Sequence, residues 1–171
     1  MLVKSFACFG YDDFFTLVSP ELDAICTDFF KQENYLFETA ILEAVCNAAR
    51  YSIHGQKNAE IHFRVYIDEL SLKVVVLSKT NNFNVKEYRQ NLSSLCDDPE
   101  IGNLNWGEYT KDNEDGGRGL WLMLQACQYV IMNYTGQEIT LISNRSIANN
   151  PTRKIKNLVP RFLIEEEGVI F

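Results

Sequence analysis

The sequence lacks any apolar run of the roughly 18 to 20 residues that would span a bilayer. Its start, MLVKSFACFGYDDFF, has neither the basic flank nor the small-residue cleavage site of a secretory signal. Positive charge is also scarce, because 16 Lys and Arg residues face 23 Asp and Glu residues, for a formal net charge of −7. These absences predict a cytoplasmic protein with no membrane partner, and they argue against electrostatically driven binding to nucleic acid.

Metal-binding and disulfide patterns are missing as well. The five cysteines contain no CxxC pair, and the two histidines, His54 and His62, have no second ligand at metal spacing. Most of the cysteines are therefore expected in the core. What is present, 46% apolar and 23% charged residues in a chain of 171, is typical of one globular domain.

The apolar pattern predicts alternating helices and strands. Helices are expected over 19–32, from 33 or 34 to 52 and from 117 to 130, and strands over 59–69, 71–80, 129–134 and 138–143. Residues 81–116 are irregular apart from a short helix near 85–95, and long segments of this kind are usually lids or binding loops. Trp106 lies there and either pins this segment to the body or meets a partner. The aromatic-rich start fits core packing, an edge strand or a partner surface.

Two motifs carry candidate chemistry. Glu43, Asn47 and Arg50 follow each other at helical steps of four and three, which gives a polar stripe able to orient a water and ligate Mg²⁺ through oxygen. The stripe also fits an ordinary solvated helix face. The second motif, Gly116-Gly117-Arg118-Gly119-Leu120, is a glycine-rich turn that opens a helix. Such a turn brings backbone N–H groups to a phosphate, or it permits close packing of a helix.

In combination, these features resemble the ATP-binding domain shared by gyrase and the histidine kinases. Their order is a helix with E-x-x-x-N-A, two strands, a long irregular segment and a helix opened by G-x-G-L. The stretches EAVCNA, residues 43–48, and GGRGLWLM, residues 116–123, are most similar to the bacterial anti-sigma factor serine/threonine kinases. The resemblance covers roughly residues 15 to 144. It implies an α+β fold of the Bergerat type, a two-layer sandwich with helices on one face of a mixed, mostly antiparallel sheet. The domain is assigned to residues 1–144, with a C-terminal extension over 145–171.

The resemblance also implies roles for individual residues. Glu43 is the catalytic base, and Asn47 holds Mg²⁺ against the phosphates of ATP with Arg50 beside it. Gly116, Gly117, Gly119 and Leu120 form the phosphate-binding turn, to which Arg118 adds positive charge. The implied partners are a sigma factor or an anti-anti-sigma-like protein, and dimers are common in the family, so a homodimer stays an open alternative.

One motif departs from the family, which after the second strand has an Asp and two glycines around the adenine ring. Alignment on Phe83 puts Ser78 at the Asp, and Thr80 and Asn82 at the glycines. The Ser78 hydroxyl can reach a base through water, whereas the side chains at 80 and 82 crowd the ring. Three functions therefore stay open: an ATP-dependent serine/threonine kinase, a descendant that binds no nucleotide and acts only as a protein-interaction module, and a pocket adapted to another small ligand.

Overall fold

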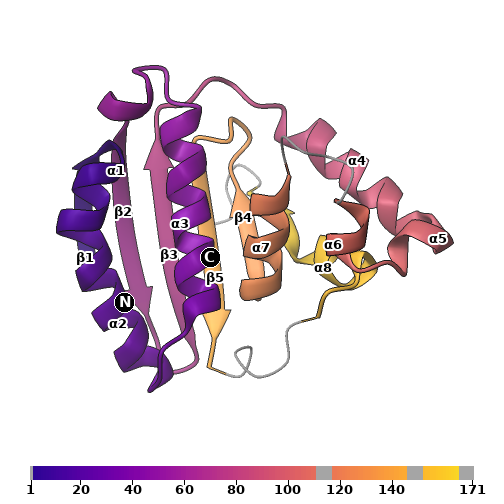
Figure 1. The fold of residues 1–171 in the computed structure, drawn as a ribbon, viewed down its shortest axis with the longest axis horizontal. Helices are drawn as coiled ribbons and strands as arrows, with labels where there is room; N and C mark the ends of the chain where they lie inside the picture. Colours follow the sequence, from indigo (N-terminus) through magenta and orange to yellow (C-terminus); the bar gives the residue numbers. More distant parts are fainter. Residues whose placement is uncertain (1, 111–116, 146–151, 166–171) are drawn as a thin grey trace.

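The computed structural model describes residues 2–110, 117–145 and 152–165, and these form a six-stranded sheet with helices packed against it (Figure 1). The strand order across the sheet is β1-β2-β3-β5-β4-β6. The strands are β1 (Leu2–Phe9), β2 (Glu60–Ile67), β3 (Ser71–Ser78), β4 (Tyr129–Met132), β5 (Glu138–Asn144) and β6 (Phe162–Ile164). Neighbouring strands are antiparallel except β4 and β6, which run parallel. The predicted α+β class, with its mixed, mostly antiparallel sheet, is confirmed.

A layer of helices covers the face of the sheet that is turned to the viewer in Figure 1. It consists of α1 (Gly10–Asp13), α2 (Ser19–Phe30), α3 (Tyr35–Arg50) and α7 (Arg118–Ala126), with the π-helical turn η1 (Phe14–Val18) joining α1 to α2. The other helical segments are η2 (Gln56–Asn58), α4 (Val85–Asp97), α5 (Pro99–Gly102), α6 (Trp106–Tyr109), α8 (Ile155–Leu158) and η4 (Val159–Arg161).

Local sequence explains where the long helices begin and end. Pro20 lies in the first turn of α2, where its missing N–H costs nothing. The helix ends at Phe30 rather than at residue 32 as predicted, because Lys31 adopts a left-handed conformation with φ 59°. Asn34 caps α3, its Oδ1 accepting a hydrogen bond from the backbone N–H of Phe37 at 3.2 Å. α7 ends at Ala126, short of the predicted 130, because Tyr129 already belongs to β4.

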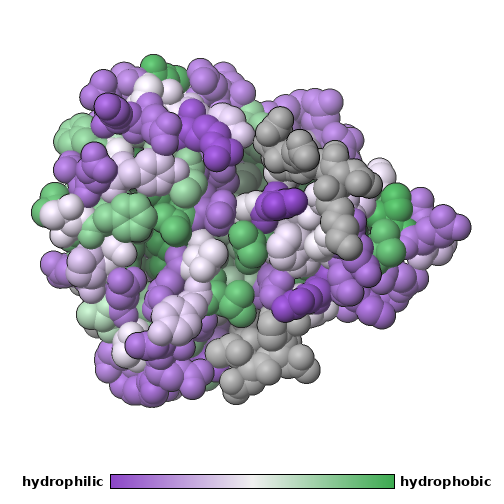
Figure 2. All heavy atoms as spheres, in the orientation of Figure 1, coloured by the Kyte–Doolittle hydropathy of each residue, from purple (hydrophilic) through white to green (hydrophobic). Residues whose placement is uncertain are grey.

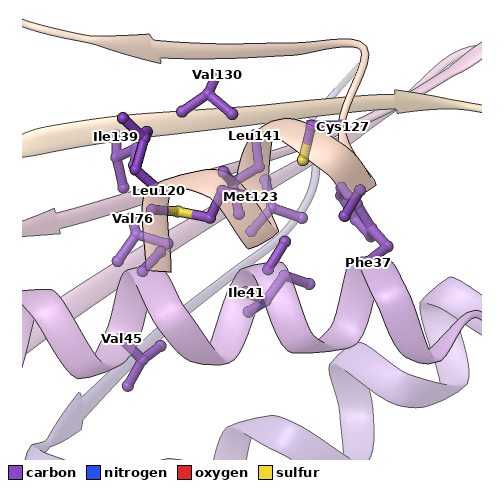
Figure 3. Close-up of a cluster of buried hydrophobic side chains, with 14 of the residues drawn as sticks. Phe37, Ile41, Val45, Val76, Leu120, Met123, Cys127, Val130, Ile139 and Leu141 are labelled. Atoms are coloured by element: carbon purple, nitrogen blue, oxygen red, sulfur yellow. The ribbon is translucent and has the colours of Figure 1, made fainter. Parts of the chain in front are cut away.

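The core lies between this helix layer and the sheet. Every third or fourth residue of α3 faces the strands, so that Phe37, Ile41 and Val45 are at most 2% exposed. Figure 3 shows Phe37 and Ile41 on the side of α3 that faces α7, near Met123, whereas Val45 points away from α7. Leu120 and the strand residues Val76, Val130, Ile139 and Leu141 belong to the same cluster. On the opposite face of the sheet the strands carry polar residues, as in β2, where Glu60 and His62 are exposed and alternate with the buried Ile61 and Phe63.

Residues 152–165, which lie within the predicted extension, share this core. Phe162 is fully buried and pairs with Val130 of β4, so β6 covers what would otherwise be the edge of the sheet. Its backbone carbonyl accepts a hydrogen bond from Arg89 Nε of α4 at 2.8 Å. Arg161 Nη1 donates to the carbonyls of Leu124 and Cys127, and thereby satisfies the C-terminal end of α7.

The cysteines of the chain lie mainly in its core. All five cysteines are free, and Cys8, Cys26 and Cys127 are buried, as predicted for most of them. Burial raises the pKa of Cys26 to about 12, with smaller contributions from Glu38 and Asp23, so this thiol stays protonated at neutral pH. Among the described residues, no helix is long and apolar enough to cross a membrane.

Candidate functional site

The predicted polar stripe lies on α3, on the side away from the sheet. Glu43 and Asn47 are half-buried and Arg50 is exposed, whereas the intervening Ala44, Val45, Ala48 and Ala49 are buried. The stripe is therefore fixed by a rigid helix whose opposite side is embedded in the core. It leads towards the C-terminal end of α3, at the same end of the molecule as the end of β3 and the start of α7 (Figure 1).

The glycine-rich turn opens α7 as predicted, although Gly116 lies outside the described residues. Gly117 is the N-cap and adopts φ 106°, a conformation that L side chains rarely reach, and apart from its chain neighbours no atom of the described residues lies within 4 Å of an added Cβ. Arg118 is exposed. Leu120 is 5% exposed and anchors the first turn in the core. The first backbone N–H groups of α7 and the positive end of its dipole thus lie at a fixed place.

The two motifs meet where α7 passes α3. The helices run in opposite directions, because Cys127 at the end of α7 lies near Phe37 in the first turn of α3 (Figure 3). A Cβ added to Gly119 would lie 2.5 Å from Oε2 and 3.4 Å from Cδ of Glu43. Gly119 is therefore the position that lets the Glu43 carboxylate lie against the backbone at the start of α7. A negative charge is favourable there because the helix dipole is positive at this end.

Tyr11 of α1 extends this group of residues, and the sequence analysis did not find it. Burial raises the pKa of Tyr11 above its usual value, a hydrogen bond with Cys46 and the charge of Glu43 raise it further, and Arg50 lowers it. The phenol therefore lies within electrostatic reach of the α3 stripe. No local pattern marks Tyr11 among the aromatic residues of the N-terminal segment, because its proximity to α3 depends on how α1 packs.

Ser78 ends β3 with its side chain on the same face as Val74 and Val76, towards the helices. The residue is 8% exposed, and within the described residues its hydroxyl has no hydrogen-bond partner. Its backbone N–H donates to the carbonyl of Gln137 at 3.0 Å. A buried polar group without a partner costs about 1–3 kcal/mol, so such groups are rare and call for an explanation.

The segment after Ser78 is held against the C-terminal end of α3. Backbone hydrogen bonds of 3.0 Å run from Ile53 N–H to the Lys79 carbonyl and from Asn81 N–H to the Tyr51 carbonyl. Gln137 Nε2 donates to the Thr80 carbonyl at 3.1 Å. Thr80 is 9% exposed, so its side chain is enclosed within this braced segment.

The oxygen donors of α3 suit Mg²⁺ only if other groups complete its ligand set. Glu43 and Asn47 supply a carboxylate and an amide oxygen one turn apart. Mg²⁺ needs six oxygen ligands and commonly takes one or two from protein and the rest from phosphates and water. Among the described residues, no group of three or more His, Cys, Asp or Glu could hold a metal ion alone. The donor set therefore fits Mg²⁺ that arrives with a polyphosphate.

No protein-family model matches the chain, and no curated protein matches it. The structure brings Glu43 into contact with Gly119, and it brings Tyr11 within electrostatic reach of Glu43 and Arg50.

Proposed function

We propose that the chain is a regulatory protein of the anti-sigma factor kinase type, which holds ATP with Mg²⁺ between α3 and α7 and phosphorylates a protein partner on Ser or Thr. The observation that carries the proposal is the contact between Glu43 and Gly119. It joins the acidic residue of one motif to the glycine turn of the other, although the two are far apart in the sequence.

The proposed roles follow from the chemistry of each group. The Glu43 carboxylate accepts the proton of the attacking hydroxyl, since it lies beside the start of α7, where phosphates bind. Asn47, one turn further along α3, supplies an oxygen ligand for Mg²⁺. Among the described residues nothing beyond its chain neighbours lies within 4 Å of a Cβ placed on Gly117, and this room would admit a phosphate oxygen to the backbone N–H groups. Bound Mg²⁺ would neutralise charge on the phosphates during transfer.

A second candidate, a protein-interaction module that binds no nucleotide, is favoured by the segment after β3. Thr80 is enclosed there, its carbonyl accepts a hydrogen bond from Gln137, and hydrogen bonds to Ile53 and Tyr51 brace its neighbours Lys79 and Asn81. In the resembled family this is where glycines leave room for adenine. Ser78 also replaces the carboxylate that receives the adenine amino group. Loss of one charge-assisted hydrogen bond weakens binding by roughly tenfold or more.

Isothermal titration of the full chain with ATP and with ADP, each with Mg²⁺, separates the two candidates. The kinase proposal expects saturable binding, which Asn47→Ala weakens through the metal and Glu43→Ala leaves nearly unchanged. Transfer of labelled phosphate to a candidate partner should be abolished by Glu43→Ala. The matched control is Glu69→Ala, because Glu69 is an exposed acid in the turn between β2 and β3. Absence of binding at millimolar nucleotide, with partner binding retained by both α3 variants, would instead establish the interaction module.

A further inference from the structure

A cavity of about 210 Å³ opens between the η1–α2 segment and the first half of α3. Phe14, Leu22 and Ile41 are at most 3% exposed and form its apolar floor. The volume is below the roughly 300 to 1,000 Å³ typical of small-molecule pockets, and it suits a single long side chain. Neither Glu43 nor Ser78 lines it, so the cavity is separate from the proposed nucleotide site.

Two carboxylates face this cavity, Asp23 from α2 and Glu38 from α3. Among the described residues, no Lys or Arg lines it. Burial raises the pKa of Glu38, the nearby charges of Asp23 and Glu33 raise it further, and a hydrogen bond from the backbone of Asn34 lowers it. Burial also raises the pKa of Asp23, against a lowering by the Ser19 hydroxyl, which donates to it at 3.4 Å. Burial thus disfavours the charged form of both carboxylates, and a cation placed beside them would favour it.

The chemistry of the walls favours an organic cation over a metal ion. A metal ion held by protein side chains alone would need three or more of them, and the described residues contain no such group of His, Cys, Asp or Glu. Apolar floor residues instead accommodate methylene groups. Two aromatic residues lie at the mouth of the cavity: Tyr35, which is 68% exposed, and Phe15, which is 53% exposed. The Tyr35 hydroxyl donates a hydrogen bond to Glu33. Aromatic faces beside carboxylates are favourable surroundings for a guanidinium group, which stacks and forms paired hydrogen bonds.

We propose that this cavity receives an arginine side chain of a protein partner. A protein fits better than a small amine because the apolar surface continues beyond the cavity. Phe15 and Tyr35 form an exposed rim, Leu17 of the same η1 segment is 57% exposed, and Figure 2 shows apolar surface exposed between α2 and α3. A free amine would leave this rim in water, whereas a protein surface covers it. The chain's net charge of −7 also complements a basic partner.

The test titrates the ¹⁵N-labelled full chain with amino acids whose termini are blocked. Binding is measured from the changes in the NMR chemical shifts of the protein. N-acetyl-arginine methylamide should give saturable shifts in the lining residues of α2 and α3 with a roughly millimolar Kd, as expected for one side chain. The neutral isostere, blocked citrulline, should give none, and blocked lysine should bind several-fold more weakly. An acetylated Gly-Arg-Leu-Gly amide should bind about tenfold more tightly, and Phe15→Ala should remove that gain.

Glu38→Gln and Asp23→Asn should each weaken binding of the arginine probe about tenfold. Asp28→Asn is the matched control, because Asp28 lies on α2, pairs with Lys31 at 2.7 Å and does not line the cavity. Two variants at different helices keep the test valid should one fail to fold. No saturable shifts, equal binding of citrulline or lysine, or unchanged binding in both variants would overturn the arginine site. Equal affinity of the peptide and the blocked arginine would overturn the protein partner.

Discussion

The indole N–H of Trp106 donates a hydrogen bond to Oε1 of Gln125 over 2.8 Å. The bond joins α6 to α7, and the ring contact between Tyr109 and Trp121, with centroids 6.3 Å apart, reinforces it. Of the two roles that the sequence left open for Trp106, pinning its segment to the body is thus realised. Since α7 also carries Gly117 and Gly119, the position of α6 is tied to the helix that begins at the candidate site.

Replacing Trp106 by Phe should destabilise the fold by about 1–3 kcal/mol. Gln125 is 5% exposed, so its carbonyl would be left buried without this donor. Urea unfolding measures the free energy, and hydrogen exchange should show faster opening of residues 99–109. Combining Trp106→Phe with Gln125→Leu should recover part of the loss, because the leucine leaves no unpaired carbonyl. Equal stability of Trp106→Phe and the parent would contradict the pin.

Gly119→Ala should displace the Glu43 carboxylate, because the new Cβ would lie 2.5 Å from Oε2. Alanine alone favours a helix by roughly 1 kcal/mol over glycine, and the clash offsets that gain. In the Glu43→Ala background the clash is absent, so Gly119→Ala should stabilise by roughly the full amount. A double-mutant cycle by urea unfolding should therefore give a coupling of at least about 0.5 kcal/mol. Additive effects would mean that the two side chains do not meet.

Glu38→Gln should raise the thermal stability of the fold at pH 7 by less than about 1 kcal/mol, since the carboxylate is partly screened by solvent. The raised folded-state pKa of Glu38 means that its contribution to stability is complete below its unfolded pKa of about 4. That contribution is lost as the pH rises through the folded value. The advantage of the variant should therefore vanish near pH 4, in paired melting curves at both pH values.

Asp28→Asn is the control for this experiment, because its stability change at pH 7 is expected in the opposite direction. Lys31 lowers the pKa of Asp28, mainly through a hydrogen bond, so its charged form is favoured in the folded state. The substitution should be neutral or destabilising at pH 7, opposite to Glu38→Gln. A loss of stability in Glu38→Gln at pH 7 would show that the surroundings of Glu38 are not negative.

Ser78→Ala should stabilise the ligand-free chain by about 1 kcal/mol or more, because it removes a buried hydroxyl that has no partner among the described residues. Differential scanning calorimetry with and without Mg²⁺–ATP measures the effect and its ligand dependence. The kinase proposal expects the variant to show a smaller increase in melting temperature on nucleotide addition. Destabilisation in the absence of nucleotide would mean that the hydroxyl already has a hydrogen-bond partner.

Phe162→Ala should cost about 3–5 kcal/mol in unfolding free energy, as for other fully buried aromatic residues. The neighbouring Leu163 is only half-buried on the other face of β6, so Leu163→Ala is the matched control and should cost much less. Urea unfolding gives both values. Similar costs would argue that β6 is not part of the main core.

The sequence predicts the elements whose signals are local. The apolar spacing in α3 and the VVVL run of β3 mark a helix and a buried strand, and the turn around Gly136 marks the β4–β5 hairpin. The ends of helices and strands are harder to predict. The end of α2 is an example, because Lys31 adopts a left-handed conformation there, and lysine does not favour that conformation. The strand character of Leu2–Phe9 was one of several alternatives, since its pairing with β2 is made by distant residues.

The candidate site is predicted in part for the same reason. Helical spacing alone groups Glu43, Asn47 and Arg50. The contact of Glu43 with Gly119 and the approach of Tyr11 depend on how three helices pack, which has no local signature. The pair of carboxylates at Asp23 and Glu38 likewise arises from two helices. A pattern that holds within one element is readable from sequence, whereas a pocket between elements is not.

The parallel pairing of β6 with β4 also affects the order of folding during synthesis on the ribosome. Until residues 161–164 emerge, β4 is an open strand edge and the carbonyls at the end of α7 lack their Arg161 donor. Chains terminated near residue 145 therefore carry an unprotected edge able to pair with other chains, and they are prone to aggregate. Pairing of β6 with β4 thus protects the protein from association as well as completing its sheet.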